Sequence, residues 1–149
     1  MIFRGVIQHT KWAGAFLLLS VMASCSSQPK MQPPAPEAVL QAIPAPDPAQ
    51  YDHIQNMKQW RNPYLIVRTD GVALYDSADS AEIILKPEEV MAALARLPAS
   101  YWPYGRVIAA TEIATRASEQ DGVAIRRNKG IVGGMLEDAH VAIKWVPAG

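Results

Sequence analysis

PYLIVRTDGVALY, residues 63–75, contains two short apolar runs separated by an Asp-Gly pair. Such a pair between two apolar runs is a strong signal for a β-hairpin, because both turn positions favour a positive φ. Leu65 and Val67 share one strand face, where Val72 and Leu74 of the second run can meet them. The segment therefore predicts the hairpin on which a sheet is built.

Two helices are predicted after the hairpin. Residues 87–97 begin with a proline, place two glutamates in the first turn and repeat apolar residues at helical spacing. Residues 121–139 show a second helical pattern, with Asp121 as the expected N-cap. Three glycines in this second helix either weaken it or mark close packing on the sheet: Gly130, Gly133 and Gly134.

Three further strands complete the predicted order, at residues 81–85, 106–113 and 141–146. Alanines in the second of these leave a helix open as the alternative. The order β-β-β-α-β-α-β predicts an α+β fold, an α/β two-layer sandwich. We expect the β-hairpin to belong to a mixed four- to five-stranded sheet, with two helices packed on one face.

The first 24 residues have the organisation of a signal peptide. Arg4 and Lys11 precede WAGAFLLLSVMAS, residues 12–24, an apolar run of 13 residues. A membrane-spanning helix needs about 20 apolar residues, so this run fits a signal-peptide core instead. It ends in Met22-Ala23-Ser24-Cys25, which resembles the bacterial lipobox. An ordinary cleaved signal with a chance cysteine is the alternative.

The resemblance to bacterial lipoproteins implies that Cys25 becomes the lipid-bearing N-terminus. Maturation in that family attaches three acyl chains, and each buried CH₂ contributes about 0.8 kcal/mol to membrane binding. Ser26 stands where an Asp would retain the protein in the inner membrane. The resemblance therefore implies a lipid-anchored cell-envelope protein at the outer membrane, facing the periplasm.

Residues 25–50 predict a disordered, Pro-rich tether, and residues 51–149 a small α/β periplasmic domain. Seven of the twelve prolines lie in residues 26–50, where they disfavour helix and sheet. The tether is either a spacer toward the cell wall or a leader of no specific length. Residues 37–43, EAVLQAI, could form one helical turn or a docking peptide.

Composition excludes several classes of function. The formal net charge is zero, and loss of Arg4 and Lys11 with the signal leaves 12 basic residues against 14 acidic ones. This charge gives no basic stripe for nucleic acid. One cysteine excludes structural disulfides and Cys-based metal sites. We expect no cofactor and no metal.

Two clusters are candidates for a binding surface. Tyr101, Trp102 and Tyr104 form an aromatic loop that is expected to be partly exposed, whereas Trp145 and Tyr64 are expected to fill the core. The alternative is that the loop aromatics also pack inside. The densest basic cluster is a candidate site for acidic partners, or else the solvated face of a helix: Arg126, Arg127 and Lys129.

Catalytic groupings are weak in this sequence. His53 and His140 are the only histidines after the signal, and catalysis would need one of them to converge with carboxylates. No Ser-His-Asp set, phosphate-binding loop or HExxH motif can be drawn. No catalytic residue is assigned.

The folded region is similar to the periplasmic domain of the ExbD/TolR biopolymer-transport family. The matching pieces are residues 66–71, IVRTDG, then 87–90, PEEV, then the helix ending at 136–139, LEDA, and the strand 141–146. The resemblance covers about 85 residues and implies the fold. That family has a transmembrane helix with an essential acid, which this chain lacks, so a motor role is not implied.

The sequence thus predicts a non-enzymatic envelope lipoprotein whose small domain binds an envelope protein or peptidoglycan. The alternatives are a periplasmic enzyme that acts on the cell wall, and an immunity or inhibitor lipoprotein.

Overall fold

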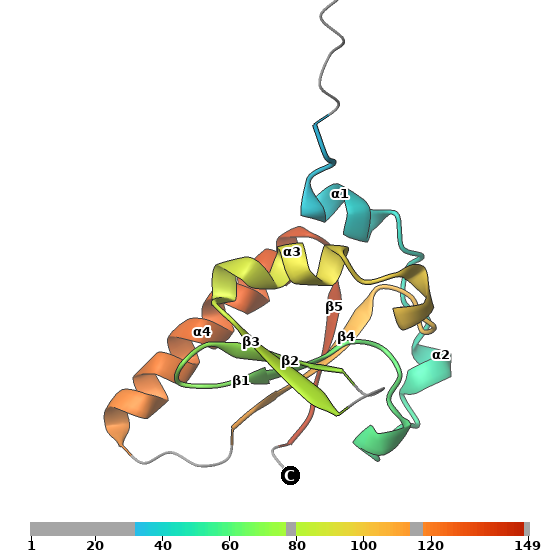
Figure 1. Cartoon of the computed structure of the whole chain (residues 1–149). Helices are drawn as coiled ribbons and strands as arrows, with labels where there is room; N and C mark the ends of the chain where they lie inside the picture. The colour runs from blue at the N-terminus through green and yellow to red at the C-terminus, as the bar shows by residue number, and fades with distance from the viewer. Residues whose placement is uncertain (1–31, 77–79, 114–117, 148–149) are drawn as a thin grey trace, which may run out of the picture. The chain divides into compact units, whose positions relative to one another are not determined.

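The computed structural model describes residues 32–76, 80–113 and 118–147. The signal peptide and Cys25 lie outside these described residues. Residues 33–149 form one compact unit around a mixed sheet with strand order β3-β2-β1-β4-β5 (Figure 1). The strands are β1 (Tyr64–Val67), β2 (Val72–Asp76), β3 (Ala81–Leu85), β4 (Val107–Glu112) and β5 (Ala142–Trp145).

The helices are α1 (Pro36–Gln41), α2 (Pro48–Tyr51), α3 (Val90–Ala95) and α4 (Glu119–Asp138), joined by single 3₁₀ turns η1 (Met57–Gln59), η2 (Pro87–Glu89) and η3 (Ala99–Tyr101). Within the described residues, no helix combines the length and the apolar character that crossing a membrane requires.

The predicted hairpin is confirmed, with a different turn. Strands β1 and β2 pair antiparallel, so that Leu65 lies opposite Leu74 and Val67 opposite Val72. Of the Asp-Gly pair only Gly71 has a positive φ, of 151°. The backbone N–H of Arg68 donates to the Gly71 carbonyl at 2.9 Å, closing a loop of four residues rather than two.

The two-layer prediction is also confirmed. Strand β3 pairs antiparallel with β2, while β4 pairs parallel with β1 and β5 parallel with β4. Helices α3 and α4 cover one face of this sheet (Figure 1). Leu94 and Leu136 from the helices pack there with Leu65 and Ile108 from the strands, and all four side chains are fully or almost fully buried.

The expectation of a disordered tether over residues 25–50 is wrong for its second half. Residues 36–41 form α1, which packs against α3 and buries Leu40 completely. The helix forms despite the prolines because Pro36 occupies its first turn, where a missing N–H removes no hydrogen bond. The folded unit therefore begins near Pro33 rather than at Tyr51.

The second sheet face is partly covered by residues 48–60. The rings of Tyr51, Trp60 and Tyr104 pack together there, with centroids 5.3–6.3 Å apart.

Burial is the main cause that raises the pKa of Tyr51, and the negative charges of Asp52 and Asp47 raise it further. Burial also raises the pKa of Tyr64, and a hydrogen bond with Thr111 partly offsets that shift.

The N-cap of the long helix α4 lies about one turn earlier in the chain than predicted. The Ser118 hydroxyl accepts from the Asp121 N–H at 3.2 Å, so Ser118 rather than Asp121 is the N-cap. The helix ends where His140 adopts a left-handed φ of 57°. The Val141 N–H then donates to the Leu136 carbonyl at 2.8 Å, which closes a Schellman turn and starts β5.

Because Leu40 is fully buried, we predict that Leu40→Ala lowers the free energy of unfolding by about 2–5 kcal/mol. Urea unfolding followed by circular dichroism measures the loss. Val39→Ala in the same helix is the control and should cost less, since Val39 is only half-buried. Equal, small effects of the two substitutions would show that α1 is not part of the stable domain.

Candidate functional site

Helix α4 and strand β5 form the two walls of a surface groove of about 800 Å³. Strand β5 contributes the apolar side chains of Ile143 and Trp145, and Val141 precedes them on the same face. Helix α4 contributes one row of residues at helical spacing: Arg126, Lys129, Gly130, Gly133 and Glu137. Glu112 at the end of β4 completes the lining.

The glycines of α4 keep this groove open. A β-carbon added at Gly130 or Gly133 would meet no other atom within 4 Å. These glycines therefore do not mark close packing on the sheet, which was one of the two interpretations of the sequence. Each glycine still lowers the stability of a helix by about 1 kcal/mol relative to alanine. The open helix wall is therefore accompanied by a less stable helix.

Lys129 organises one end of the groove. Its Nζ lies 2.7 Å from Glu112 Oε1 and 4.1 Å from the centre of the Trp145 ring. Trp145 is 40% exposed, whereas the other tryptophans of the described residues are buried. A cation over an exposed aromatic ring contributes about 0.5–1 kcal/mol, enough to favour one orientation of the ring.

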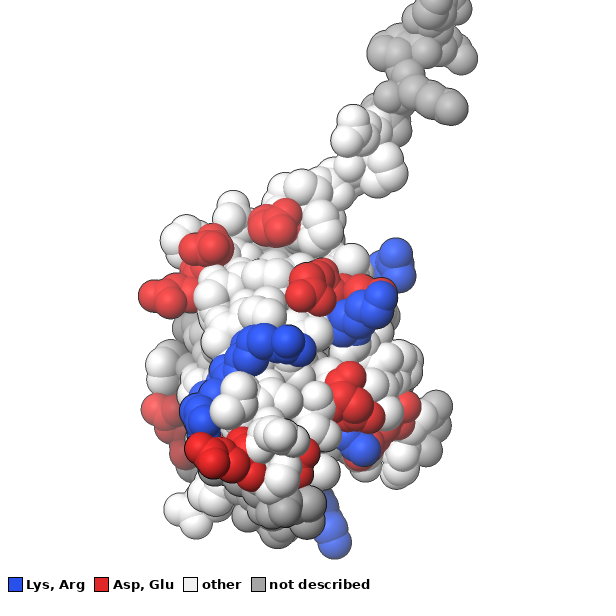
Figure 2. All heavy atoms as spheres, turned by 90° about the vertical axis from the view of Figure 1, so that its left-hand side faces the viewer, with Lys and Arg blue, Asp and Glu red and all other residues white. Residues whose placement is uncertain are grey.

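The charges along the groove differ between its two ends. Arg126 and Lys129 lie toward the Trp145 end, and Glu137 lies one or more turns nearer the end of α4. Among the residues that the structure describes, neither Arg126 nor Glu137 forms an ion pair. Figure 2 shows acidic and basic residues interspersed on one face of the molecule, without a large area of one sign.

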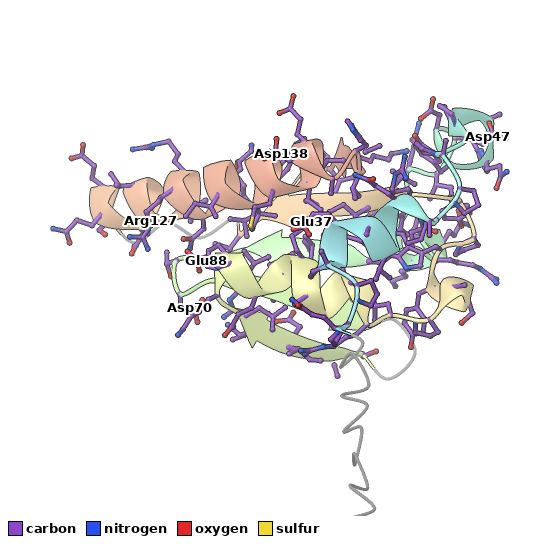
Figure 3. All side chains as sticks on the ribbon, turned by 90° about the horizontal axis from the view of Figure 1, so that it is seen from above. Glu37, Asp47, Asp70, Glu88, Arg127 and Asp138 are labelled. Carbon is purple, nitrogen blue, oxygen red and sulfur yellow. The ribbon has the colours of Figure 1, made fainter. Side chains whose placement is uncertain are left out.

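The predicted basic cluster is divided by the helix. Successive residues of an α-helix are about 100° apart, so Arg127 cannot share the groove with Arg126 and Lys129. Figure 3 shows Arg127 on the flank of α4 that faces Glu88 and Asp70. The structure thus brings two of the three predicted basic residues together and places the third elsewhere.

The predicted aromatic surface is not a single surface. Trp102 is only 4% exposed and packs in the main core, which contradicts its expected exposure, whereas Tyr101 and Tyr104 are partly exposed as expected. Tyr104 is half-buried against Trp60, and its hydroxyl donates to the Gln59 carbonyl at 3.2 Å. Tyr101 is also half-buried and lines a small cavity of about 50 Å³. The turn η3 directs Trp102 inward, where its large apolar area is removed from water.

Trp145 lines the groove, although the sequence predicted it in the core. It was expected there because no phenylalanine follows the signal, and it was expected to share a strand face with Val141 and Ile143. Those three residues do share the face toward α4, but β5 is the last strand of the sheet, and its outer side remains open. Alternation identifies a face of a strand, whereas only long-range pairing decides which strand lies at the edge.

Neither of the two histidines lines the groove. His53 follows α2 and is exposed, and exposed His140 ends α4, where its carbonyl accepts from Arg106 Nε at 2.8 Å. In the described part of the chain, no three His, Cys, Asp or Glu side chains gather closely enough to hold a metal ion. The groove can therefore bind a partner through aromatic, apolar and ionic contacts.

These positions predict losses of stability of different size for the two tryptophans. Trp102→Ala should lower the free energy of unfolding by about 3–5 kcal/mol, because it empties part of the core. Trp145→Ala should cost about 1 kcal/mol, the value of a partly exposed ring and its cation contact. Urea unfolding of both variants measures the difference. A larger loss for Trp145→Ala would place that side chain, and not Trp102, in the core.

Comparison with known proteins gives no relative from which a function could be transferred: no family model, no curated protein and no solved structure matches the chain. The similarity to the ExbD/TolR domain and the lipoprotein signal stay predictions from the sequence.

Proposed function

We propose that the protein is a lipid-anchored cell-envelope protein, at the outer membrane and facing the periplasm, whose folded domain binds another envelope component without catalysing a reaction. The component is an envelope protein or peptidoglycan, and the α4–β5 groove is the binding site. The observation that carries this proposal is an exposed tryptophan held by Lys129 in an open groove beside Arg126.

The groove has the properties of a recognition site. Binding clefts for small ligands typically measure about 300–1,000 Å³, and the groove falls in this range at about 800 Å³. Tryptophan and arginine are enriched among the residues that dominate binding energy at protein interfaces. Trp145 and Arg126 both line the groove, so a bound partner can cover both at once.

Because Trp145 and Arg126 line the groove, we predict that Trp145→Ala or Arg126→Glu reduces partner capture at least tenfold. The measurement is in-cell crosslinking of the full-length lipidated protein, followed by quantification of the captured component. Arg127→Glu is the matched control, since it makes the same charge change on the other flank of α4. Equal losses with Arg126→Glu and Arg127→Glu would contradict the assignment of the groove.

The anchor is tested separately at Cys25. We predict that Cys25→Ala abolishes incorporation of radiolabelled palmitate and moves the protein from the membrane fraction to the soluble periplasmic fraction, because the thiol that receives the lipid is removed. Ser24→Thr retains the cysteine and serves as the control for altered signal processing. Undiminished labelling of Cys25→Ala would contradict a lipid anchor at this residue.

A further inference from the structure

The groove continues onto an open sheet edge, and this identifies the chemistry of the partner. We propose that the α4–β5 groove binds an extended peptide segment of a protein, which pairs with β5 as an added strand and carries apolar side chains at alternate positions and an acidic group at the Arg126 end. This inference rests on the proposed function and narrows the envelope component to a protein.

The backbone of β5 has one edge available for pairing. The Ala142 N–H donates to the Arg106 carbonyl at 3.1 Å, and the Val146 N–H donates to the Ala110 carbonyl at 2.9 Å. These residues therefore face β4, and alternation along the strand turns the backbone groups of Ile143 and Trp145 to the other edge. No strand of the described residues pairs with that edge.

This edge lacks the usual protection against an added strand. Exposed edges are commonly protected by lysine side chains or by proline. Lys144 is the charged residue of β5, but its Nζ donates to the carbonyls of Tyr51 at 2.8 Å and Ile54 at 3.1 Å on the far sheet face. The strand itself, Ala142–Trp145, contains no proline. An approaching strand therefore meets neither a charged side chain of β5 nor a missing donor in it.

The groove beside the edge can receive alternate side chains of the added strand. Those side chains point toward α4, where Gly130 and Gly133 leave space and Ile143 and Trp145 offer apolar surface. From Arg126 to Glu137 the helix wall extends about 16 Å at 1.5 Å per residue. An extended peptide rises about 3.3 Å per residue, so about five of its residues fit along the wall.

Charge complementarity selects an acidic segment at the Trp145 end. Glu112 pairs with Lys129, which leaves the Arg126 guanidinium as the cation without an ion pair among the described residues that line this end. The chain's own residues 26–35, SSQPKMQPPA, are a poor occupant, because they contain three prolines, one lysine and no acid. Proline cannot donate to a ladder, and the lysine would face a cation. The occupant is therefore a segment of another protein.

The experiment selects peptides with the purified, full-length lipidated protein in detergent micelles. A random linear peptide library is panned on it, and enriched peptides are synthesised with single N-methyl groups at each backbone position. We expect enriched peptides to alternate apolar residues and to carry an acid near one end. N-methylation at every second residue should weaken binding at least tenfold, and at the intervening residues less than twofold.

Variants of the protein link the peptide to the groove. Trp145→Ala and Arg126→Glu should each weaken peptide binding at least tenfold, whereas Arg127→Glu should leave it within twofold. Ile143→Pro, which removes an outward N–H of β5, should abolish binding while retaining the thermal unfolding transition. If that variant does not fold, the N-methyl pattern alone decides whether the backbone pairs.

Three outcomes would overturn strand addition. They are no enriched peptide, uniform tolerance of N-methylation, and a dimer of this chain that is lost in Ile143→Pro, which would assign the edge to a second copy. If soluble muropeptides bind in a Trp145-dependent manner while no library peptide does, strand addition fails and the proposed function stands. If in-cell capture is also independent of Trp145 and Arg126, both fail.

Discussion

The guanidinium of Arg106 joins three segments that are far apart in the sequence. Its Nε donates to the His140 carbonyl at 2.8 Å, and its Nη1 donates to the Gln41 carbonyl at 2.9 Å. The first contact holds the junction between α4 and β5 against the start of β4, and the second holds the end of α1 there. Charge-assisted hydrogen bonds of this kind are about twice as strong as neutral ones. The turn from α4 into β5, the two walls of the groove, is therefore fixed by this residue together with the left-handed His140 that it contacts.

Local patterns were sufficient for most elements of the fold. The hairpin follows from alternation in residues 63–75, and α3 follows from the proline and glutamates of the 3₁₀ turn η2 that leads into it. A helical turn at residues 37–43 was only one of two options because prolines dominate residues 26–50, although Pro36 stands at a position where a helix tolerates it. What stabilises α1 is the burial of Leu40 in the main core and the packing of α1 against α3, about fifty positions later in the chain. Sequence spacing within the segment carries no information about that contact.

The site was harder to predict than the fold, and for a similar reason. Arg126, Arg127 and Lys129 are neighbours in sequence, but the helical turn places Arg127 about 100° around α4 from Arg126, on the flank that faces Glu88 and Asp70. Trp102 and Trp145 exchanged their expected places, since the first lies under η3 in the core and the second lies on an edge strand. Periodicity identified the correct strand face for Trp145. The exposure of Trp145 depends on the position of β5 at the edge of the sheet, and that position is set by pairing between strands far apart in the sequence.

The docking of α1 also limits how far the domain can stand from a lipid anchor. If Cys25 is acylated, only the residues between it and Pro36 link the lipid to the folded unit. A fully extended chain of that length spans at most about 40 Å, less than half of the about 90 Å that a tether ending at residue 50 would allow. With such an anchor, the short linker would keep the groove close to the bilayer. A partner held farther away, deep in the wall, would have to extend its own segment toward the membrane surface.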